Sequence, residues 1–440
     1  MLPLNSITFA DLHPTTRRLL IARALRSVGQ GALVVDLALY LNTLGWDGVA
    51  IGGVLTGAGL FGAALTLLIG QTSDQLRRKP FLLVYEGVAL LCSLVALLTS
   101  QTIWLAGAIV LAGFGRGANG AAGPFSPAEQ AWLAEEVPPS RRGRVYSLNT
   151  ALGFFGMGVG ALIAMLPALW SGWLSGALAY RPLFALAALS AVGNLVLLGQ
   201  GHESYRGVTH AEDAAARQRE AAIRHDENRI LRKLVFVNGF NGLAIGLTGP
   251  LISYWFALRF GVGPAEIAPV MAVTFFMTSV SSWLTGWLTE HIGIVKSIVW
   301  VQFLGMVSLA LLPLMPAYWL ASLVYLLRSA FSRGSLGARQ ALTIGLVRDE
   351  RRGLATSLNA VSFQLPQSVG PSVAGYLLDA DQFALPFFIG AFLQAIYLVA
   401  YDRVFRRYEP PRETVGSHAQ VVIARGADVL TERDGEDRAH

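Results

Sequence analysis

Long apolar runs separated by short polar turns form the dominant pattern of this sequence. A run of about 20 apolar residues is long enough to cross the ~30 Å hydrocarbon core of a bilayer as a helix. Such runs are predicted at 17–44, 48–70, 80–99, 103–133, 146–169, 180–200, 232–258, 265–287, 297–315, 317–346, 354–377 and 384–405. The run at 232–258 is predicted to break near Gly249-Pro250. The pattern therefore predicts an all-α integral membrane protein with twelve transmembrane helices, six on each side of a polar gap.

Two repeats indicate that the two sets of six helices are copies of one unit. The sequence RRGRVYSLN at 141–149 recurs as RRGLATSLN at 351–359, and the basic turn at 70–80 has a weaker counterpart at 286–296. The two repeats have similar offsets, which would be an unusual coincidence. We therefore predict two pseudo-symmetric halves of the same topology, with a substrate site near the membrane midplane between them.

The polar segments set the predicted domain boundaries. The N-terminal half is predicted at 1–200 and the C-terminal half at 232–405. The charged gap at 201–231 has a capping-box pattern followed by Ala-rich sequence, which predicts either a cytoplasmic helix against the bundle or a solvated spacer. The polar, mixed-charge end at 406–440 predicts a disordered cytoplasmic tail.

The distribution of charge predicts how the chain is oriented. Hydrophobic residues make up 53% of the chain and charged residues only 14%, whereas a soluble protein carries about 25% charged residues. Most of the 34 Lys and Arg fall on the side of the chain termini, and only Arg181 and Arg259 fall near the opposite loops. This asymmetry predicts a multi-pass protein of the cytoplasmic (inner) membrane with both termini in the cytoplasm.

The sequence carries no pattern typical of an enzyme, a cofactor site or a metal site. Residues 115–120 (GRGANG) fit the spacing of a dinucleotide-binding motif, but they fall inside a long apolar run rather than at a strand–helix turn. The single Cys92 excludes an internal disulfide. The net charge of +6 is not gathered on one face, which argues against nucleic acid as a partner. We expect a monomer in the lipid bilayer with no cofactor and no metal.

Polar residues inside the predicted spans mark candidate functional positions, because each charge near the bilayer centre costs about 2.5–3.5 kcal/mol. The candidates for substrate binding or coupling are Arg26, Asp36, Arg116, Asn238, Asn241 and Arg328. A protonatable acid such as Asp36 is a candidate proton-coupling group. Arg116 is either a substrate contact or a buried structural or coupling arginine. Glu129 and Arg339, at equivalent positions of the two halves, are interpreted as an inner-side salt bridge. Glu86 either forms a further salt bridge or lies against lipid-screened neighbours.

Two local signatures resemble those of a known transporter family. The loop matches are Gly70, Asp74, Arg78 and Lys79 and, in the weaker copy, Gly286, Glu290 and Gly293. Arg116 and Gly120 match a second signature, on the fourth helix. Together with the twelve spans, these residues resemble the major facilitator superfamily over roughly 15–405. The family's antiporter signature, Gly-Pro on the fifth helix, is absent there and falls instead on the eleventh, at 370–371.

The resemblance implies a site and a gate. Helices 1, 4, 7 and 10 would line a central cavity, which the arginines would make cationic. Asp74 would face the start of the eleventh helix and, with Gly70 and Arg78, help to lock the inner gate. By symmetry, Glu290, with Gly286, would face the start of the fifth helix. A carboxylate at a helix N-terminus is worth roughly 0.3–1 kcal/mol, so such a latch is physically reasonable.

The expected function is secondary active transport of a small organic solute by alternating access. Resemblance to proton-linked exporters favours proton-coupled efflux. An alternative within transport is uptake or exchange of an anionic solute through the arginine-rich cavity. An alternative of another class is a transport-inactive membrane sensor or scaffold, against which the polar cavity argues.

Overall fold

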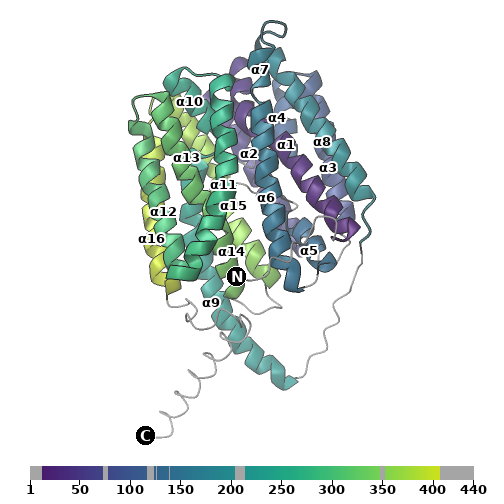
Figure 1. The fold of residues 1–440 in the computed structure, drawn as a ribbon, viewed down its shortest axis with the longest axis vertical. Helices are drawn as coiled ribbons and strands as arrows, with labels where there is room; N and C mark the ends of the chain where they lie inside the picture. Colours follow the sequence, from purple (N-terminus) through teal and green to yellow (C-terminus); the bar gives the residue numbers. More distant parts are fainter. Residues whose placement is uncertain are drawn as a thin grey trace.

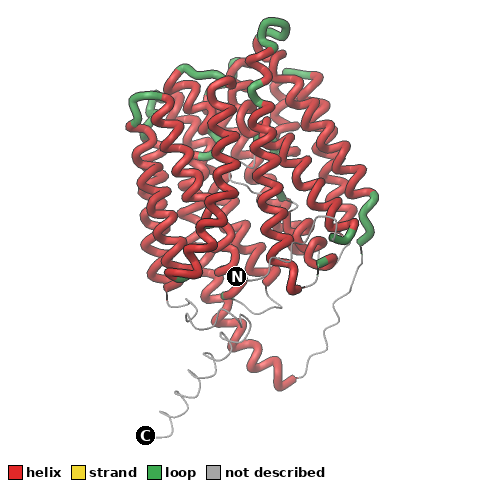
Figure 2. The backbone as a smooth tube through the Cα atoms, in the orientation of Figure 1, coloured by secondary structure: helices red, strands yellow, loops and turns green. Residues whose placement is uncertain are grey.

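The computed structural model describes residues 12–72, 78–115, 123–124, 126–137, 139–203, 214–346 and 352–406. These residues form helices joined by short loops, and no strand occurs among them (Figure 2). The prediction of an all-α protein is therefore confirmed for the described part of the chain.

The helices of the N-terminal half run mostly along the long axis of the molecule (Figure 1). They are α1 (Pro14–Thr43), α2 (Gly48–Thr72), α3 (Arg78–Leu98), α4 (Thr102–Ala112), α5 (Ser126–Glu136), α6 (Pro139–Ile163), the short α7 (Leu166–Leu169), the 3₁₀ helix η2 (Gly176–Tyr180) and α8 (Arg181–Gly199).

The helices of the C-terminal half lie beside them. They are α9 (Ala214–Thr248), α10 (Ile252–Phe260), α11 (Pro264–Ile292), α12 (Ile294–Leu311), the 3₁₀ helix η3 (Leu312–Leu314), α13 (Tyr318–Gly334), α14 (Leu336–Gly345), α15 (Arg352–Asp379) and α16 (Leu385–Phe405).

Every predicted apolar run overlaps a helix of the structure. Within the described ranges, eight helices are long and apolar enough to cross a membrane: α1, α2, α3, α6 with α7, η2 with α8, the second part of α9, α12 with η3, and α16. The predicted run at 103–133 corresponds to α4 and α5, and the run at 317–346 is divided between α13 and α14. The chain is therefore built as a multi-pass membrane protein.

The start and the end of α9 differ in how well the sequence predicts them. A break at Gly249-Pro250 is predicted and confirmed, because α9 ends at Thr248 and α10 begins at Ile252; proline has no amide hydrogen to continue a helix. The linker prediction needs correction. Helix α9 is continuous from Ala214, so the linker helix and the seventh span are one element, and its first part extends below the bundle rather than lying against it (Figure 1).

Glycines allow the helices within each half to approach closely. A Cβ at Gly160 of α6 would lie 2.0 Å from the carbonyl oxygen of Val28 in α1, and one at Gly156 would lie 2.4 Å from that of Ala24. In the other half, a Cβ at Gly246 of α9 would lie 2.3 Å from the carbonyl oxygen of Gln367 in α15. Small residues that bring backbones together are a common basis of helix packing in membranes.

The buried apolar residues form one shared core at one end of the molecule and two separate cores at the other. The shared cluster joins both halves near α7 and α10, where Leu37 and Tyr40 of α1 belong to the same cluster as Tyr254 and Trp255 of α10. Towards the opposite end, a cluster around Trp132 contains only N-terminal-half residues. A third cluster, formed by residues of α9, α12, α14 and α16, contains only C-terminal-half residues. The halves are thus joined most firmly at the α7/α10 end.

Candidate functional site

The two halves meet through a polar contact at the α7/α10 end. Asp379, the last residue of α15, accepts hydrogen bonds from the backbone amides of Gly48 at 2.8 Å and Val49 at 2.7 Å. These amides belong to the first turn of α2, whose N–H groups have no partner within the helix. The carboxylate of one half therefore caps a helix of the other half. We name this contact the Asp379 clamp.

Close backbone packing extends the clamp along α2 and α15. A Cβ at Gly375 would lie 1.9 Å from the carbonyl oxygen of Gly48, and one at Gly52 would lie 2.2 Å from that of Pro371. One turn further, the hydroxyl of Ser372 donates to that of Thr56 at 2.8 Å. Side chains larger than glycine would separate the two helices, so this contact depends on glycine at these positions.

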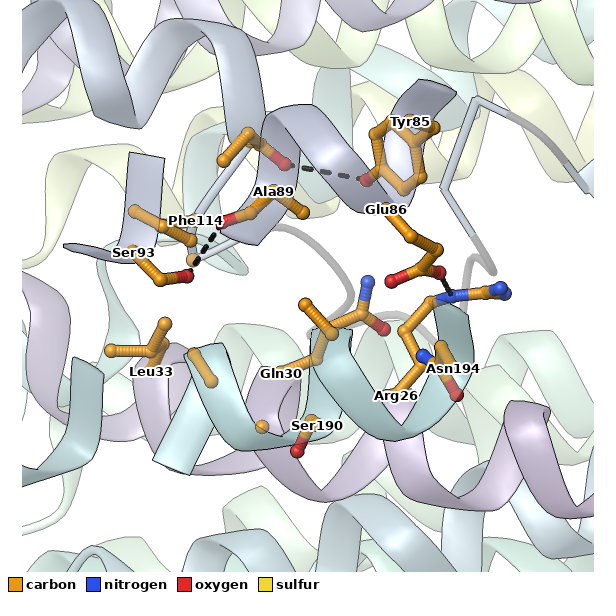
Figure 3. Close-up of a pocket in the computed structure, with 16 residues that line it drawn as sticks. Arg26, Gln30, Leu33, Tyr85, Glu86, Ala89, Ser93, Phe114, Ser190 and Asn194 are labelled. Atoms are coloured by element: carbon orange, nitrogen blue, oxygen red, sulfur yellow. Dashed lines mark hydrogen bonds and ion pairs between the residues drawn. The ribbon is translucent and has the colours of Figure 1, made fainter. Parts of the chain in front are cut away.

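An ion cluster lies inside the N-terminal half. Arg26 of α1 donates from Nε to Glu86 of α3 at 2.6 Å (Figure 3). It also donates from Nη1 to Glu129 of α5 at 2.5 Å. All three side chains are at least 94% buried. The predicted pairing of Glu129 with Arg339 is wrong, because Glu129 pairs with Arg26; the prediction that Glu86 forms a salt bridge is confirmed. The contacts of Arg26 thus tie three helices of one half together rather than reaching the other half.

A polar pocket adjoins this ion cluster between α1, α3 and α8. Gln30, Ser190 and Asn194 line it together with Arg26 and Glu86 (Figure 3). The amide oxygen and nitrogen of Asn194 and the hydroxyl of Ser190 have no hydrogen-bond partner in the structure, and both residues are more than 95% buried. The pocket therefore offers free donors and acceptors within one half.

Asp36 lies on α1 one turn before Tyr40, in largely aromatic surroundings. It is 1% exposed, and neither carboxylate oxygen has a hydrogen-bond partner in the structure. Tyr180, at the start of α8, lies close enough to interact electrostatically with the Asp36 carboxylate. The Tyr40 ring packs against Tyr180 at 5.9 Å and Phe184 at 5.3 Å. Asp36 is therefore a buried acid between α1 and α8, facing its own half of the molecule.

Arg328 and Arg333 of α13 are buried in the C-terminal half, each 6% exposed. Arg328 donates to the hydroxyl of Thr248 at 2.8 Å, at the end of α9 where the chain breaks. Arg333 donates to the hydroxyl of Tyr325 at 3.4 Å, and its guanidinium lies 5.1 Å from the centre of the Phe275 ring. Among the described residues, both arginines therefore contact neutral groups.

The two predicted asparagines of α9 differ in their surroundings. Asn238 donates to Asn359 at 2.8 Å and to Ser362 at 3.1 Å, which ties α9 to α15. Asn241 is fully buried, and neither its amide oxygen nor its amide nitrogen has a partner. Asn238 is therefore engaged in helix packing, whereas Asn241 retains its full hydrogen-bonding capacity.

The predicted gate residues are only partly described. Asp74 and Arg116 lie outside the described residues. Gly70 lies in the last turn of α2, and Arg78 begins α3 with its backbone amide donating to Glu203 at 2.6 Å. Gly286 and Glu290 are not in a loop, because α11 continues to Ile292 and only Gly293 separates it from α12. In both copies of the basic turn, the glycine therefore lies within a helix.

Three residues that make the contacts described above were not among the candidates predicted from the sequence. Asp379 was missed because the predicted span ends at 377, although an acid closing a long helix could have suggested a partner at another helix start. Glu203 accepts from the amides of Arg78 and Lys79, and it lies in the gap that the sequence treats as a linker. Asn194 is a neutral residue in an apolar run, and no pattern in the sequence distinguishes it.

Comparisons with known proteins agree with this geometry. The model of the Major Facilitator Superfamily matches residues 19–225 and 234–431. A D-xylose–proton symporter is similar in structure, with a TM-score of 0.69 and 16% identity over 90% of this chain and 98% of that one. The nucleoside transporter NupG is similar with a TM-score of 0.63 and 14% identity, over 89% of this chain and 99% of that one. A bacterial homologue of the iron transporter ferroportin, in an inward-facing state, is similar with a TM-score of 0.66 and 14% identity, over 89% of this chain and 98% of that one.

No curated protein sequence matches the chain. Because the sequence identities are low, the similarity to these solved structures shows the fold alone. The family match, in contrast, covers both halves of the chain and indicates a transporter rather than an enzyme. The chain therefore belongs to the major facilitator superfamily.

Proposed function

We propose that the protein is a secondary active transporter that moves a small organic solute by alternating access. In this proposal twelve helices cross the inner membrane, and both termini lie in the cytoplasm, as the asymmetry of Lys and Arg predicts. The observation that carries the proposal is the unequal joining of the two halves. They share one apolar core near α7 and α10 but have separate cores at the opposite end. Such a molecule can open by rocking one half against the other.

Proton coupling through Asp36 is the second part of the proposal. A carboxylate charge buried without a partner costs several kcal/mol. A change in the surroundings of Asp36 would therefore change how readily it binds or releases a proton. Asp36 lies on α1 beside α8, and α1 also contacts α10 and α11 of the other half. A rocking movement would therefore alter the environment of the helix that carries the acid. Outward transport is proposed from the resemblance of the chain to proton-linked exporters of the family.

The test uses purified protein in liposomes that enclose a pH-sensitive dye. Candidate acids, cations and neutral compounds are added outside, and solute-driven proton movement is recorded. Asp36→Asn should abolish this proton movement while exchange of labelled solute across the membrane continues. Asp381→Asn is the matched control, because Asp381 is an exposed acid and should leave both signals unchanged.

Two outcomes contradict the proposal in different ways. Proton movement that persists in Asp36→Asn at the rate of the unmodified protein would refute the coupling role while leaving transport intact. An absence of both proton movement and exchange for every class of solute would favour a sensor or scaffold, the alternative from outside transport.

A further inference from the structure

Three arginines of the tenth predicted span gather at one pocket of the C-terminal half. Arg328 and Arg333 of α13 and Arg339 of α14 line it, together with the hydroxyl groups of Ser329 and Ser332. Apolar side chains from α9, α14 and α15 complete the wall. The pocket therefore places cationic and hydroxyl-bearing side chains beside apolar side chains.

No described carboxylate compensates these three charges. The ion pairs among the described residues involve other side chains. Within the same part of the chain, Arg328 and Arg333 contact hydroxyl groups and an aromatic ring. Nε of Arg328, Nη1 of Arg333 and Nε of Arg339 have no hydrogen-bond partner. Because Arg328 and Arg333 are 94% buried, water has little access to replace the missing acceptors.

The N-terminal half contains a buried arginine, Arg26, whose charge is compensated by carboxylates. Arg26 is as deeply buried as Arg328, but it binds two carboxylates, from Glu86 and Glu129. A buried ion without a counter-charge carries a large desolvation penalty. Among the described residues, no carboxylate therefore compensates the arginine pocket of the C-terminal half, whereas Arg26 of the N-terminal half is paired with two carboxylates.

We infer that the pocket formed by Arg328, Arg333 and Arg339 holds the oxyanion group, a carboxylate or a phosphate, of the transported solute. Planar guanidinium groups bind such groups through paired hydrogen bonds, and neighbouring hydroxyls supply further donors. That the anion is cargo rests on the proposed transport function, whereas its binding is independent of transport and is tested separately.

The test measures the thermal melting of the purified full-length protein in an uncharged detergent. The probes are inorganic phosphate, succinate and, as a cationic control, choline. Phosphate or succinate should raise the melting temperature of the unmodified protein in a saturable way, and choline should not, since only a ligand of the native state stabilises it. Arg328→Gln and Arg333→Gln should raise the Kd for the anion by roughly 10- to 100-fold, the loss expected for a charge-assisted hydrogen bond.

Two further variants separate binding from folding. Arg328→Lys keeps the charge but loses the paired geometry, so its Kd should fall between those of the unmodified protein and Arg328→Gln. Arg232→Gln removes an exposed arginine of α9 and should bind like the unmodified protein. Without anion, Arg328→Gln should melt no lower than the unmodified protein, because it removes an uncompensated charge.

Three results would overturn the inference. One is an unmodified protein whose melting temperature responds to neither phosphate nor succinate. Another is an equal response of Arg328→Gln and the unmodified protein. The third comes from bilayer nanodiscs: stabilisation by anionic lipid, lost in Arg328→Gln, with no effect of the soluble anions would assign the pocket to a lipid headgroup. Failure of transport in liposomes with intact anion binding would instead contradict only the proposed function.

Discussion

The Asp379 clamp offers a direct way to shift the equilibrium between the conformations of the protein. Its carboxylate bonds the amides of Gly48 and Val49 across the two halves, so it can exist only while the α7/α10 end is closed. Asp379→Ala removes both acceptors and the charge. Asp379→Asn removes the charge and one acceptor oxygen but leaves the other. We expect both substitutions to favour opening at this end, with alanine having the larger effect.

The size of the effect follows from the two hydrogen bonds and the position of the carboxylate. Each bond has a net value of about 0.5–1.5 kcal/mol, and a negative charge at a helix N-terminus adds about 0.3–1 kcal/mol. Asp379 is exposed, so water competes for the same groups and the lower parts of these ranges apply. A loss of about 1–2 kcal/mol changes the equilibrium constant between closed and open forms by a factor of about 5–30.

Distances between two spin labels can measure this shift. The labels are attached at Gln101→Cys, before α4, and Ala265→Cys, at the start of α11; both positions are exposed and lie on different halves. The native Cys92 is replaced by alanine so that labelling is specific. The unmodified protein should show mainly one short distance. Asp379→Ala should add or enlarge a population at longer distance, and Asp379→Asn should give a smaller change.

Asp381→Asn is the matched control for the spin-label experiment. It makes the same change of charge two residues away, and Asp381 has a positive φ of 59°, a conformation that asparagine tolerates. Its distance distribution should equal that of the unmodified protein. Identical distributions for Asp379→Ala and the unmodified protein would refute the idea that the clamp stabilises the closed form. An equal shift in Asp381→Asn would show that the charge of the region, rather than the clamp, is responsible.

Three further predictions concern packing and buried charge. Gly52→Ala should hinder closure of α2 on α15 at a cost of about 1–3 kcal/mol, whereas Gly53→Ala, with open space at its Cβ position, should behave like the unmodified protein in the same spin-label assay. Arg26→Gln should lower the free energy of unfolding by about 3–5 kcal/mol, because two buried carboxylates lose their cation; melting in detergent measures this, and an unchanged melting temperature would contradict it. Glu203→Gln should lower the melting temperature slightly, since it weakens the cap on α3 worth about 0.5–2 kcal/mol, and hydrogen exchange at the first turn of α3 should increase.

The fold was predictable because its signal is repeated along the whole chain. Apolar runs of bilayer length and the break at Gly249-Pro250 depend on local composition, which the sequence displays directly. The continuity of the linker helix with the seventh span was not predicted. A charged helix and the apolar helix that continues it have different compositions, so the sequence suggests a boundary where the backbone has none.

The candidate site was less predictable, because it depends on which residues of distant segments meet. The sequence identifies Arg26, Glu86 and Glu129 as unusual in a membrane span but cannot show that one arginine serves both acids. The same limit applies to Arg328, whose significance lies in the absence of a described carboxylate beside it. The cost of a buried charge is visible in the sequence, whereas its compensation is visible only in three dimensions.

Helices α2 and α15 carry the most specific prediction about gating, because they meet across the two halves. The clamp places an acid from the end of α15 at the start of α2. The loop signature predicts the reverse arrangement at the other end, with Asp74, which follows α2 in the chain, facing the start of α15. Two carboxylate latches at opposite ends of one helix pair would stabilise opposite conformations. Asp74→Asn and Asp379→Asn should therefore shift the spin-label distances in opposite directions. The double variant should show nearly the sum of the two shifts, because the two latches would lie at opposite ends of the helix pair. Shifts in the same direction would contradict a two-ended latch and leave the Asp379 clamp as a local stabilising contact.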